Sequence, residues 1–209
     1  MVDMRSEYLA AAAAAREVIA LPEVALRWQE PSALAQMTVG ALAAHLVRAG
    51  TSILERAIED PEPAGAAIIS AAAYYAPLTA DLDSGSNARV RATAAEEALV
   101  GHRAVLGRMD RGLDRLRSGL EGQPEGRLVA VREGEVLRLD DYLATRILEL
   151  ALHTDDLCLS VGRVTPELPG IEVAIQTLIA VAAHRHGDLA VLRALARRER
   201  DPDEVLRVI

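Results

Sequence analysis

The sequence predicts a mainly α-helical, all-α protein built around a bundle of four long helices. Three observations predict this fold class. Strong helix formers (Ala, Leu, Arg and Glu) dominate, apolar residues recur at helical spacing over long stretches, and proline or glycine separates these stretches. Because each amphipathic helix must bury its apolar face, four of them are expected to pack as a bundle, with a small β-hairpin and a short helical tail added.

Prolines and caps bound the first two long helices. The first should span about 3–21 and end at Pro22. A loop in which Trp28 packs against the bundle then leads to a second helix over about 38–59, which Thr38 can cap with its hydroxyl.

The middle of the chain holds one ambiguous segment and one clear helix start. Residues 64–88 contain an apolar stretch broken by Pro77, which favours a short helix over a strand. Thr93 and Glu96 have the spacing of a capping box, in which each side chain bonds a free backbone amide of the first turn. A third long helix should therefore start there and run to about Leu120.

A hairpin and the fourth long helix follow. Segments 127–131 and 136–139 alternate apolar and polar residues around a glycine-containing turn, as hairpin strands do. The fourth helix can be capped by Asp140 or Asp141 and should end before Gly162, because glycine readily adopts the positive φ that terminates helices.

The chain is expected to divide into a bundle domain and an appendage. Prolines after residue 165 mark the boundary, so we assign residues 1–165 to the bundle and 166–209 to a short helical C-terminal extension. The extension should contain one helix over about 171–186 and another over about 188–200.

Composition limits the partners and the compartment. A formal net charge of -8 argues against nucleic acid, since binding its backbone needs clustered cationic residues. The lone Cys158 cannot form an internal disulfide, which is typical of a reducing, cytoplasmic protein. The strongly apolar stretch over 173–183 is shorter than the roughly 20 residues of a membrane span, and residues 1–20 lack the pattern of a signal peptide. We expect neither a nucleic acid nor a membrane as partner.

Glu149 and His153 are the first candidates for chemistry. Glu149 lies between Leu148 and Leu150, and burying an ionised carboxylate is costly unless it is paired or binds a metal. A spacing of four places the two side chains about 40° apart around a helix and about 6 Å apart along it, so both can reach one ion. Alone, such a pair is more often an ordinary hydrogen-bonded pair.

His45 extends this pair to a possible ligand set. It lies on an apolar face of the second helix, beside Leu42 and Leu46, where a solvated imidazole would be out of place. A single histidine there could simply be hydrogen-bonded in the core. Two histidines and one carboxylate, however, suit zinc or another divalent transition metal, and three protein ligands leave a coordination position open for water or a thiol.

Two stretches of the chain resemble the mycothiol-dependent maleylpyruvate isomerase metal-binding domain, within the DinB-like superfamily of four-helix bundles. One is Trp28–Leu46, which contains Met37-Thr38-Val39 and ends in Ala44-His45-Leu46. The other is Leu139–Leu157, which is similar to the family's Glu-x-x-x-His-x-x-Asp-Leu pattern. The resemblance covers roughly residues 5–162 and implies a DinB-like fold for the bundle.

The resemblance also implies roles for particular residues. His45, Glu149 and His153 would hold the metal, and Asp156 would orient a ligand imidazole through a hydrogen bond, with Asp155 the weaker candidate. The activity implied is that of a metal-dependent enzyme, an isomerase or an S-transferase, that uses a low-molecular-weight thiol such as mycothiol as co-substrate on a small electrophilic substrate.

The sequence departs from the family in two places. Gln36-Met37-Thr38 stands where many relatives have Gly-Trp-Thr, and the tail is shorter than the C-terminal domain of the isomerase. The catalytic arginine in the tail of the isomerase has no clear counterpart here. The resemblance therefore bears on the metal site more than on the substrate, and it assigns no catalytic residue beyond the metal ligands.

Two alternatives stay open: a non-catalytic metal-binding bundle acting as a sensor or scaffold, and a bundle without metal. A homodimer is compatible with the sequence. Among the remaining candidates, Cys158 should point away from the cluster as a small buried side chain. His184 and His186 are two apart and do not share a helix face, so a second metal site there is not expected. His102 is expected to be exposed.

Overall fold

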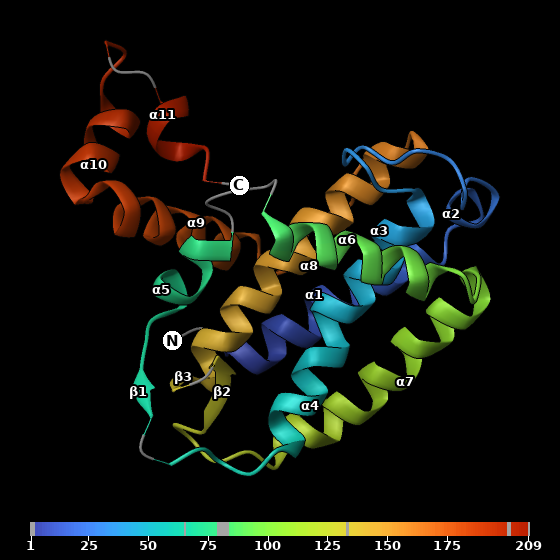
Figure 1. Cartoon of the computed structure of the whole chain (residues 1–209), viewed down its shortest axis with the longest axis horizontal. Coiled ribbons are helices and arrows are strands. Elements are labelled where there is room, and N and C mark those ends of the chain that lie inside the picture. Colours follow the sequence, from blue (N-terminus) through green and yellow to red (C-terminus); the bar gives the residue numbers. More distant parts are fainter. Residues whose placement is uncertain (1–2, 65, 79–83, 133, 200–201, 209) are drawn as a thin grey trace.

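The computed structural model, which describes residues 3–64, 66–78, 84–132, 134–199 and 202–208, confirms the mainly helical fold (Figure 1). Four long helical segments form the bundle, and the helices α9, α10 and α11 extend it at the C-terminal side. The helices are α1 (Met4–Ile19), α2 (Pro22–Leu26), α3 (Val39–Val47), the π-helix η1 (Arg48–Ser52), α4 (Ile53–Glu59), α5 (Ala71–Tyr75), the 3-10 helix η2 (Ala76–Leu78), α6 (Gly85–Ala98), α7 (His102–Glu121), α8 (Leu139–Val161), α9 (Ile171–His186), α10 (Asp188–Ala196) and α11 (Asp203–Leu206).

The ends of the first two long helices follow simple capping rules. The Asp3 side chain accepts hydrogen bonds from the backbone amides of Arg5 and Ser6 at the start of α1. Contrary to the expected end of the first helix at Pro22, α1 ends at Ile19 and Pro22 begins the separate helix α2. Proline suits this first helical position because its missing N–H would have no partner there. Thr38 caps α3, as predicted.

The expected second helix is continuous but contains a π turn that the sequence did not indicate. Two carbonyl oxygens of η1 accept hydrogen bonds from side chains of other helices. The Tyr8 hydroxyl of α1 donates to the Gly50 oxygen at 2.8 Å, and the Arg146 guanidinium of α8 donates to the Ala49 oxygen at 3.0 Å. Both bonds tie the segment that follows α3 to its neighbours.

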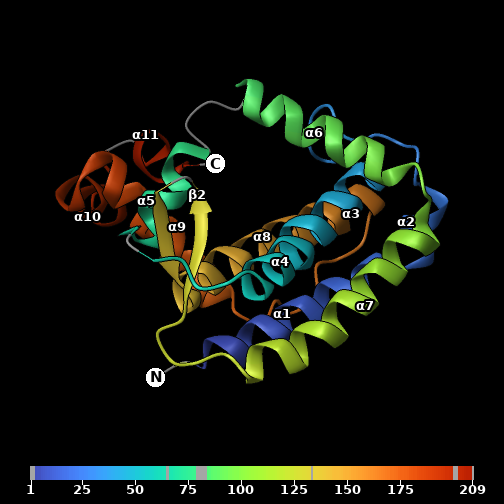
Figure 2. The same ribbon diagram turned by 60° about the horizontal axis from the view of Figure 1, so that its bottom comes forward.

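The prediction of one long third helix from Thr93 to about Leu120 is wrong, because two helices, α6 and α7, occupy this part of the chain. Thr93 and Glu96 lie inside α6, which Ser84 caps instead, and the chain turns sharply at Gly101, where φ is +85°. From this turn α6 runs over α3 while α7 runs along α1, so the two helices diverge (Figure 2). Glycine tolerates such a φ, which a side chain with a Cβ adopts only at a cost.

The predicted hairpin is present, and a third strand joins it. β2 (Leu128–Arg132) pairs antiparallel with β3 (Glu135–Arg138), and β1 (Ala67–Ile68) pairs parallel with β3. For residues 64–88 the short helix expected there is present as α5, but strand β1 precedes it. Helix α8 starts directly after β3 at Leu139, so the two aspartates proposed as its cap lie in its first turn instead.

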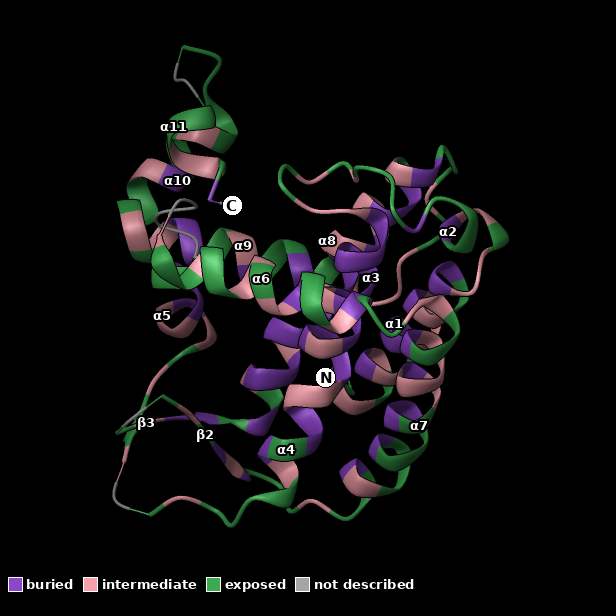
Figure 3. Cartoon of the chain, turned by 45° about the vertical axis from the view of Figure 1, so that its right-hand side comes forward, coloured by how far each residue is buried: buried purple, intermediate pink, exposed green. Residues whose placement is uncertain are grey.

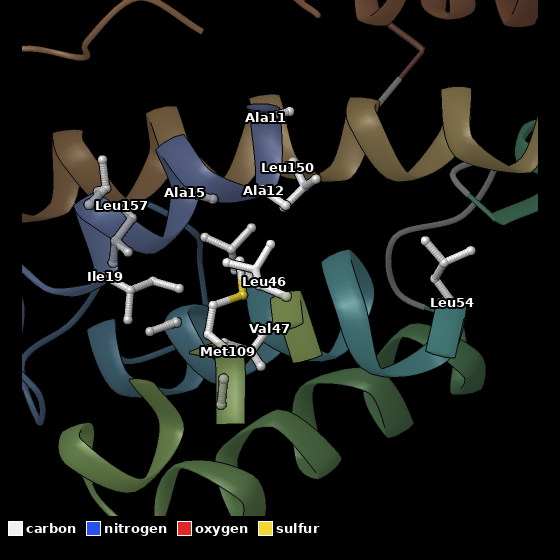
Figure 4. Close-up of a cluster of buried hydrophobic side chains, with 14 of the residues drawn as sticks. Ala11, Ala12, Ala15, Ile19, Leu46, Val47, Leu54, Met109, Leu150 and Leu157 are labelled. Carbon is white, nitrogen blue, oxygen red and sulfur yellow. The ribbon is translucent and has the colours of Figure 1, made fainter. Parts of the chain in front are cut away.

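Small side chains let α1 and α8 approach closely. Ala11, Ala12 and Ala15 of α1 are buried toward the centre of the bundle, where Leu46 of α3 and Met109 of α7 also pack (Figure 4). Because alanine fills little space, it leaves room in the interior for the larger side chains of the facing helices. Burial is strongest along α3 and α8, which carry the candidate ligands (Figure 3).

The C-terminal helices pack on α8 and α5 around a second apolar cluster. Helix α10 ends at Ala196, earlier than the expected end near residue 200, because the backbone is extended at Arg197. Helix α11 was not expected. A division of the chain at residue 165 stays a prediction. No described helix combines the length and apolar character needed to cross a membrane.

Trp28 anchors the loop before α3, as expected. Its ring is 7% exposed, its Nε1 donates to the Ala98 oxygen at 3.1 Å, and its edge meets the His102 ring at a centroid distance of 5.5 Å. The expected exposure of His102 is therefore wrong: its Nε2 lies 2.7 Å from the Ile19 oxygen, and the side chain is half-buried. This packing sets where α3 begins and hence where His45 lies along the bundle.

Candidate metal centre

The structure brings the three predicted ligands together. His45 comes from α3, and Glu149 and His153 come from successive turns of α8, which packs against α3. One ligand atom of each residue lies within 4.8 Å of the others, and among the described residues this is the only group of three or more His, Cys, Asp or Glu side chains with that property. Assignment of these residues as metal ligands remains a prediction.

The carboxylate oxygen Oε2 of Glu149 is the centre of the group. It lies 3.6 Å from Nε2 of His45 and 3.3 Å from Nε2 of His153. The two imidazole rings meet edge to face, with centroids 4.8 Å apart. The three side chains are 14%, 13% and 17% exposed in the order His45, Glu149 and His153, so the cluster is largely withdrawn from solvent but still reachable.

These separations suit a shared ion better than a set of direct hydrogen bonds. N–H···O bonds are about 2.7–3.2 Å long, which is shorter than both distances. Two ligands that hold a tetrahedral zinc ion at about 2.0–2.2 Å are about 3.4 Å from each other. In addition, Nδ1 of His45 is buried with no hydrogen-bond partner among the described residues, so mutual hydrogen bonding does not satisfy the cluster.

Asp156 lies where it can orient His153. Its Oδ2 is 3.0 Å from Nδ1 of His153, and since a carboxylate only accepts, Nδ1 carries the proton. The other ring nitrogen, Nε2, then faces Glu149. Asp155, the weaker candidate, accepts a hydrogen bond from the Thr165 hydroxyl instead.

Tyr75 is a member of the site that the sequence did not reveal. Its hydroxyl donates to Oε1 of Glu149 at 2.7 Å, and its side chain is 4% exposed. It arrives from α5, inside the segment whose structure was ambiguous. The one available signal was composition, because tyrosines at positions 74 and 75 stand out in a chain with 2% aromatic residues.

Arg146 is a second unanticipated neighbour of the cluster. It lies almost one turn before Glu149 on α8 and is 3% exposed. Its guanidinium bonds the Ala49 oxygen in the π turn and lies over the Tyr142 ring, 4.9 Å from the centroid. A buried cation at this place favours the ionised form of Glu149.

The electrostatics of the three candidate ligands differ. Burial opposes the charge of Glu149, but His153, His45 and Arg146 outweigh it and hold its pKa well below the usual range. Burial lowers the pKa of His45. Burial also disfavours charge on His153, yet Asp156 and Glu149 together raise its pKa to about 9. Without a metal, the cluster therefore holds one carboxylate, one protonated histidine and one neutral histidine near neutral pH.

The other candidates from the sequence lie elsewhere. Cys158 is buried in the main core and outside the cluster, as predicted, and His184 and His186 are exposed on α9. Two surface cavities, of about 630 and 320 Å³, lie along α1 and α7. None of the residues that line them belongs to the metal cluster.

Comparison with known proteins agrees with this architecture. The sequence pattern of the family described as mycothiol maleylpyruvate isomerase N-terminal domain matches residues 8–158. Among solved structures, the crystal structure of the mycothiol-dependent maleylpyruvate isomerase superposes with a TM-score of 0.60 at 16% identity, covering 90% of this chain and 71% of that one. At this identity the superposition shows a shared fold. A search of curated protein sequences gave no match.

Proposed function

Because the family pattern matches most of its length, the chain belongs to the mycothiol maleylpyruvate isomerase N-terminal domain family, and we propose that it is a zinc-dependent enzyme that uses a low-molecular-weight thiol. The observation that carries this proposal is the convergence of two imidazole nitrogens on one carboxylate oxygen, at 3.6 and 3.3 Å. Other divalent transition metals share this ligand preference.

Each residue of the proposed site would have a separate role. His45, Glu149 and His153 would hold the ion, and Asp156 would keep the His153 ring turned so that Nε2 faces it. Three protein ligands leave one tetrahedral position for water or a thiol. A metal held in this way supplies the chemistry that a free thiol lacks near neutral pH, because a coordinated thiol loses its proton while a free one has a pKa of about 8.5.

A thiolate beside this cluster fits two reactions. In an isomerase, the sulfur adds to an activated cis double bond, the new single bond rotates, and elimination of the same thiol leaves the trans double bond. In an S-transferase, the carbon–sulfur bond persists and the thiol is consumed. We propose mycothiol as the thiol because the family and the similar solved structure carry its name.

The proposal is tested by metal and thiol binding to the purified chain. Elemental analysis of protein prepared without chelator should find about one zinc or similar ion per chain. Titration of the cobalt-substituted protein with mycothiol, glutathione or cysteine should then produce a saturable sulfur-to-metal charge-transfer band. The variant His184→Ala, which removes an exposed histidine of α9 outside the cluster, should bind metal and thiol as the unchanged protein does.

Each negative result identifies a different alternative. Metal-free protein after growth with zinc would mean a bundle whose three residues merely contact each other. A stoichiometric metal with no thiol band would indicate a non-catalytic sensor or scaffold. A homodimer remains a separate prediction, which sedimentation velocity at several concentrations would test.

A further inference from the structure

The two oxygens of Glu149 have different partners. Oε2 faces Nε2 of both His45 and His153, whereas Oε1 accepts the hydrogen bond from the Tyr75 hydroxyl at 2.7 Å. An ionised carboxylate can bind a metal through one oxygen or through both. Here Oε1 is already engaged by a hydrogen-bond donor.

Tyr75 is held firmly in this position. Its side chain is 4% exposed and belongs to the apolar cluster that joins α5 to α9 and α8. The next residue, Ala76, offers its carbonyl oxygen to the Arg185 guanidinium of α9, and Arg185 also bonds the Val208 oxygen near the end of the chain. The C-terminal helices therefore fix the short helix that carries the hydroxyl.

We propose that Tyr75 is a positioning residue that restricts Glu149 to one-oxygen coordination and so keeps a coordination position open for the thiol. The inference rests on the proposed metal site. Within the described part of the chain, Oε1 of Glu149 is the hydrogen-bond acceptor of this hydroxyl, and a buried hydroxyl gives up such a bond only at a cost. Rotation of the carboxylate to bring Oε1 toward a metal would break this bond.

The test is Tyr75→Phe, which removes the hydroxyl and leaves the buried ring. Without its donor, Oε1 becomes free to join the ion, and the carboxylate loses its fixed orientation. We expect the dissociation constant for cobalt to change by roughly 10-fold or more, as for other residues that orient a ligand. The visible spectrum of bound cobalt should move from a four-coordinate toward a five-coordinate pattern, and the affinity for the thiol should fall.

Tyr74→Phe is the matched control. Tyr74 lies on the same short helix, packs edge to face on Tyr142 at 6.1 Å, and its hydroxyl makes no hydrogen bond within the described part of the chain. It should keep the cobalt spectrum and the thiol affinity of the unchanged protein. Thermal unfolding of the metal-free forms separates a general loss of stability from a change at the metal.

The possible failures are distinguishable. An unchanged protein that binds neither cobalt nor a thiol would refute the proposed function. If the unchanged protein binds both and Tyr75→Phe shows the same cobalt spectrum and affinities, the role of Tyr75 is refuted while the proposed function stands. Equal spectral changes in Tyr74→Phe and Tyr75→Phe would also refute the role of Tyr75, since the effect would then come from a change in the helix and not from loss of the Tyr75 hydroxyl.

Discussion

At the scale of single residues, the two histidines of the cluster are held differently. His153 has Asp156 behind its Nδ1, whereas Nδ1 of His45 is buried without a partner among the described residues. The first arrangement favours a protonated ring and the second a neutral one, which explains why their pKa values shift in opposite directions. A metal must therefore compete with a proton mainly at His153.

Metal binding should release a proton from His153. Its pKa is raised from 6.5 to about 9, so the metal-free ring is protonated near pH 7.5 and must lose that proton to become a ligand. Metal affinity should consequently rise with pH up to about 9. Asp156→Asn should lower the pKa of His153 and reduce the protons released, measured by calorimetry in buffers of different ionisation enthalpy. Equal proton release by the two proteins would contradict this assignment.

The same shift has a consequence for the metal-free fold. Because the folded pKa of His153 lies above its unfolded value, the charged ring stabilises the protein fully below pH 6.5 and this contribution is lost as the pH rises through about 9. Glu149 acts in the opposite direction, since its pKa is lowered and its contribution is lost as the pH falls.

Replacing His153 by alanine should remove both a ligand and a compensating charge. Glu149 would keep Tyr75 and Arg146 near it but lose its nearest cation, and breaking a buried ion pair in this way costs about 3 kcal/mol. Metal content by elemental analysis should fall sharply, and the urea midpoint should fall with it. A stable, metal-replete His153→Ala protein would show that this histidine is not a ligand.

At the scale of elements, the position of α3 depends on one close contact. An ideal Cβ on Gly40 would lie 2.5 Å from the Trp28 ring, so the first turn of α3 can lie against the indole only because this residue is glycine. Trp28 also contacts the turn between α6 and α7, through the Ala98 oxygen and the His102 ring. The place of His45 is thus set partly by a tryptophan at the far end of its helix.

Gly40→Ala should displace the start of α3. Overpacking of this kind costs about 1–3 kcal/mol, which exceeds the gain in helix propensity from alanine. We expect a lower urea midpoint and a weaker metal affinity, because His45 moves with its helix. Gly85→Ala is the matched control, since a Cβ there meets nothing within 4 Å and should leave stability equal or slightly higher. Equal stability of both variants would mean that the indole moves without cost.

At the scale of the whole molecule, the candidate centre joins parts of the chain that are far apart in sequence. His45 and Glu149 lie on α3 and α8, and Tyr75 arrives from α5, which the C-terminal helices hold. An ion that binds only when these elements are in place stabilises the native state over the unfolded chain. The metal is therefore expected to contribute to the stability of the fold as well as to chemistry.

Chelation should lower the unfolding temperature. At a metal concentration about 1,000 times the dissociation constant, the linkage amounts to about 4 kcal/mol, which corresponds to roughly 10 °C for a chain of this size. Calorimetry with and without zinc measures this shift. Glu149→Gln, which removes the charged ligand, should show no dependence on zinc; the same dependence in that variant would place the stabilising ion elsewhere.

Local sequence was sufficient for features that repeat along the chain or lie within a few residues. Helical periodicity predicted the mainly helical class, alternation around a glycine turn predicted the hairpin, and Thr38 was recognised as a cap. The spacing of Glu149 and His153 already placed them on one face, because helix geometry alone decides that. An apolar helix face and a family resemblance together added His45 and Asp156, and the structure places both beside the pair.

Only the tertiary structure decided the contacts between distant segments. Strand β1 has two residues and thus no alternation to detect, and good helix formers on both sides of Gly101 hid the break between α6 and α7. Tyr75 meets Glu149 across 74 residues of sequence, and Tyr8 and Arg146 reach the π turn across 42 and 97 residues. Periodicity reports which face of a helix is buried; which side chain meets it there depends on how the helices pack.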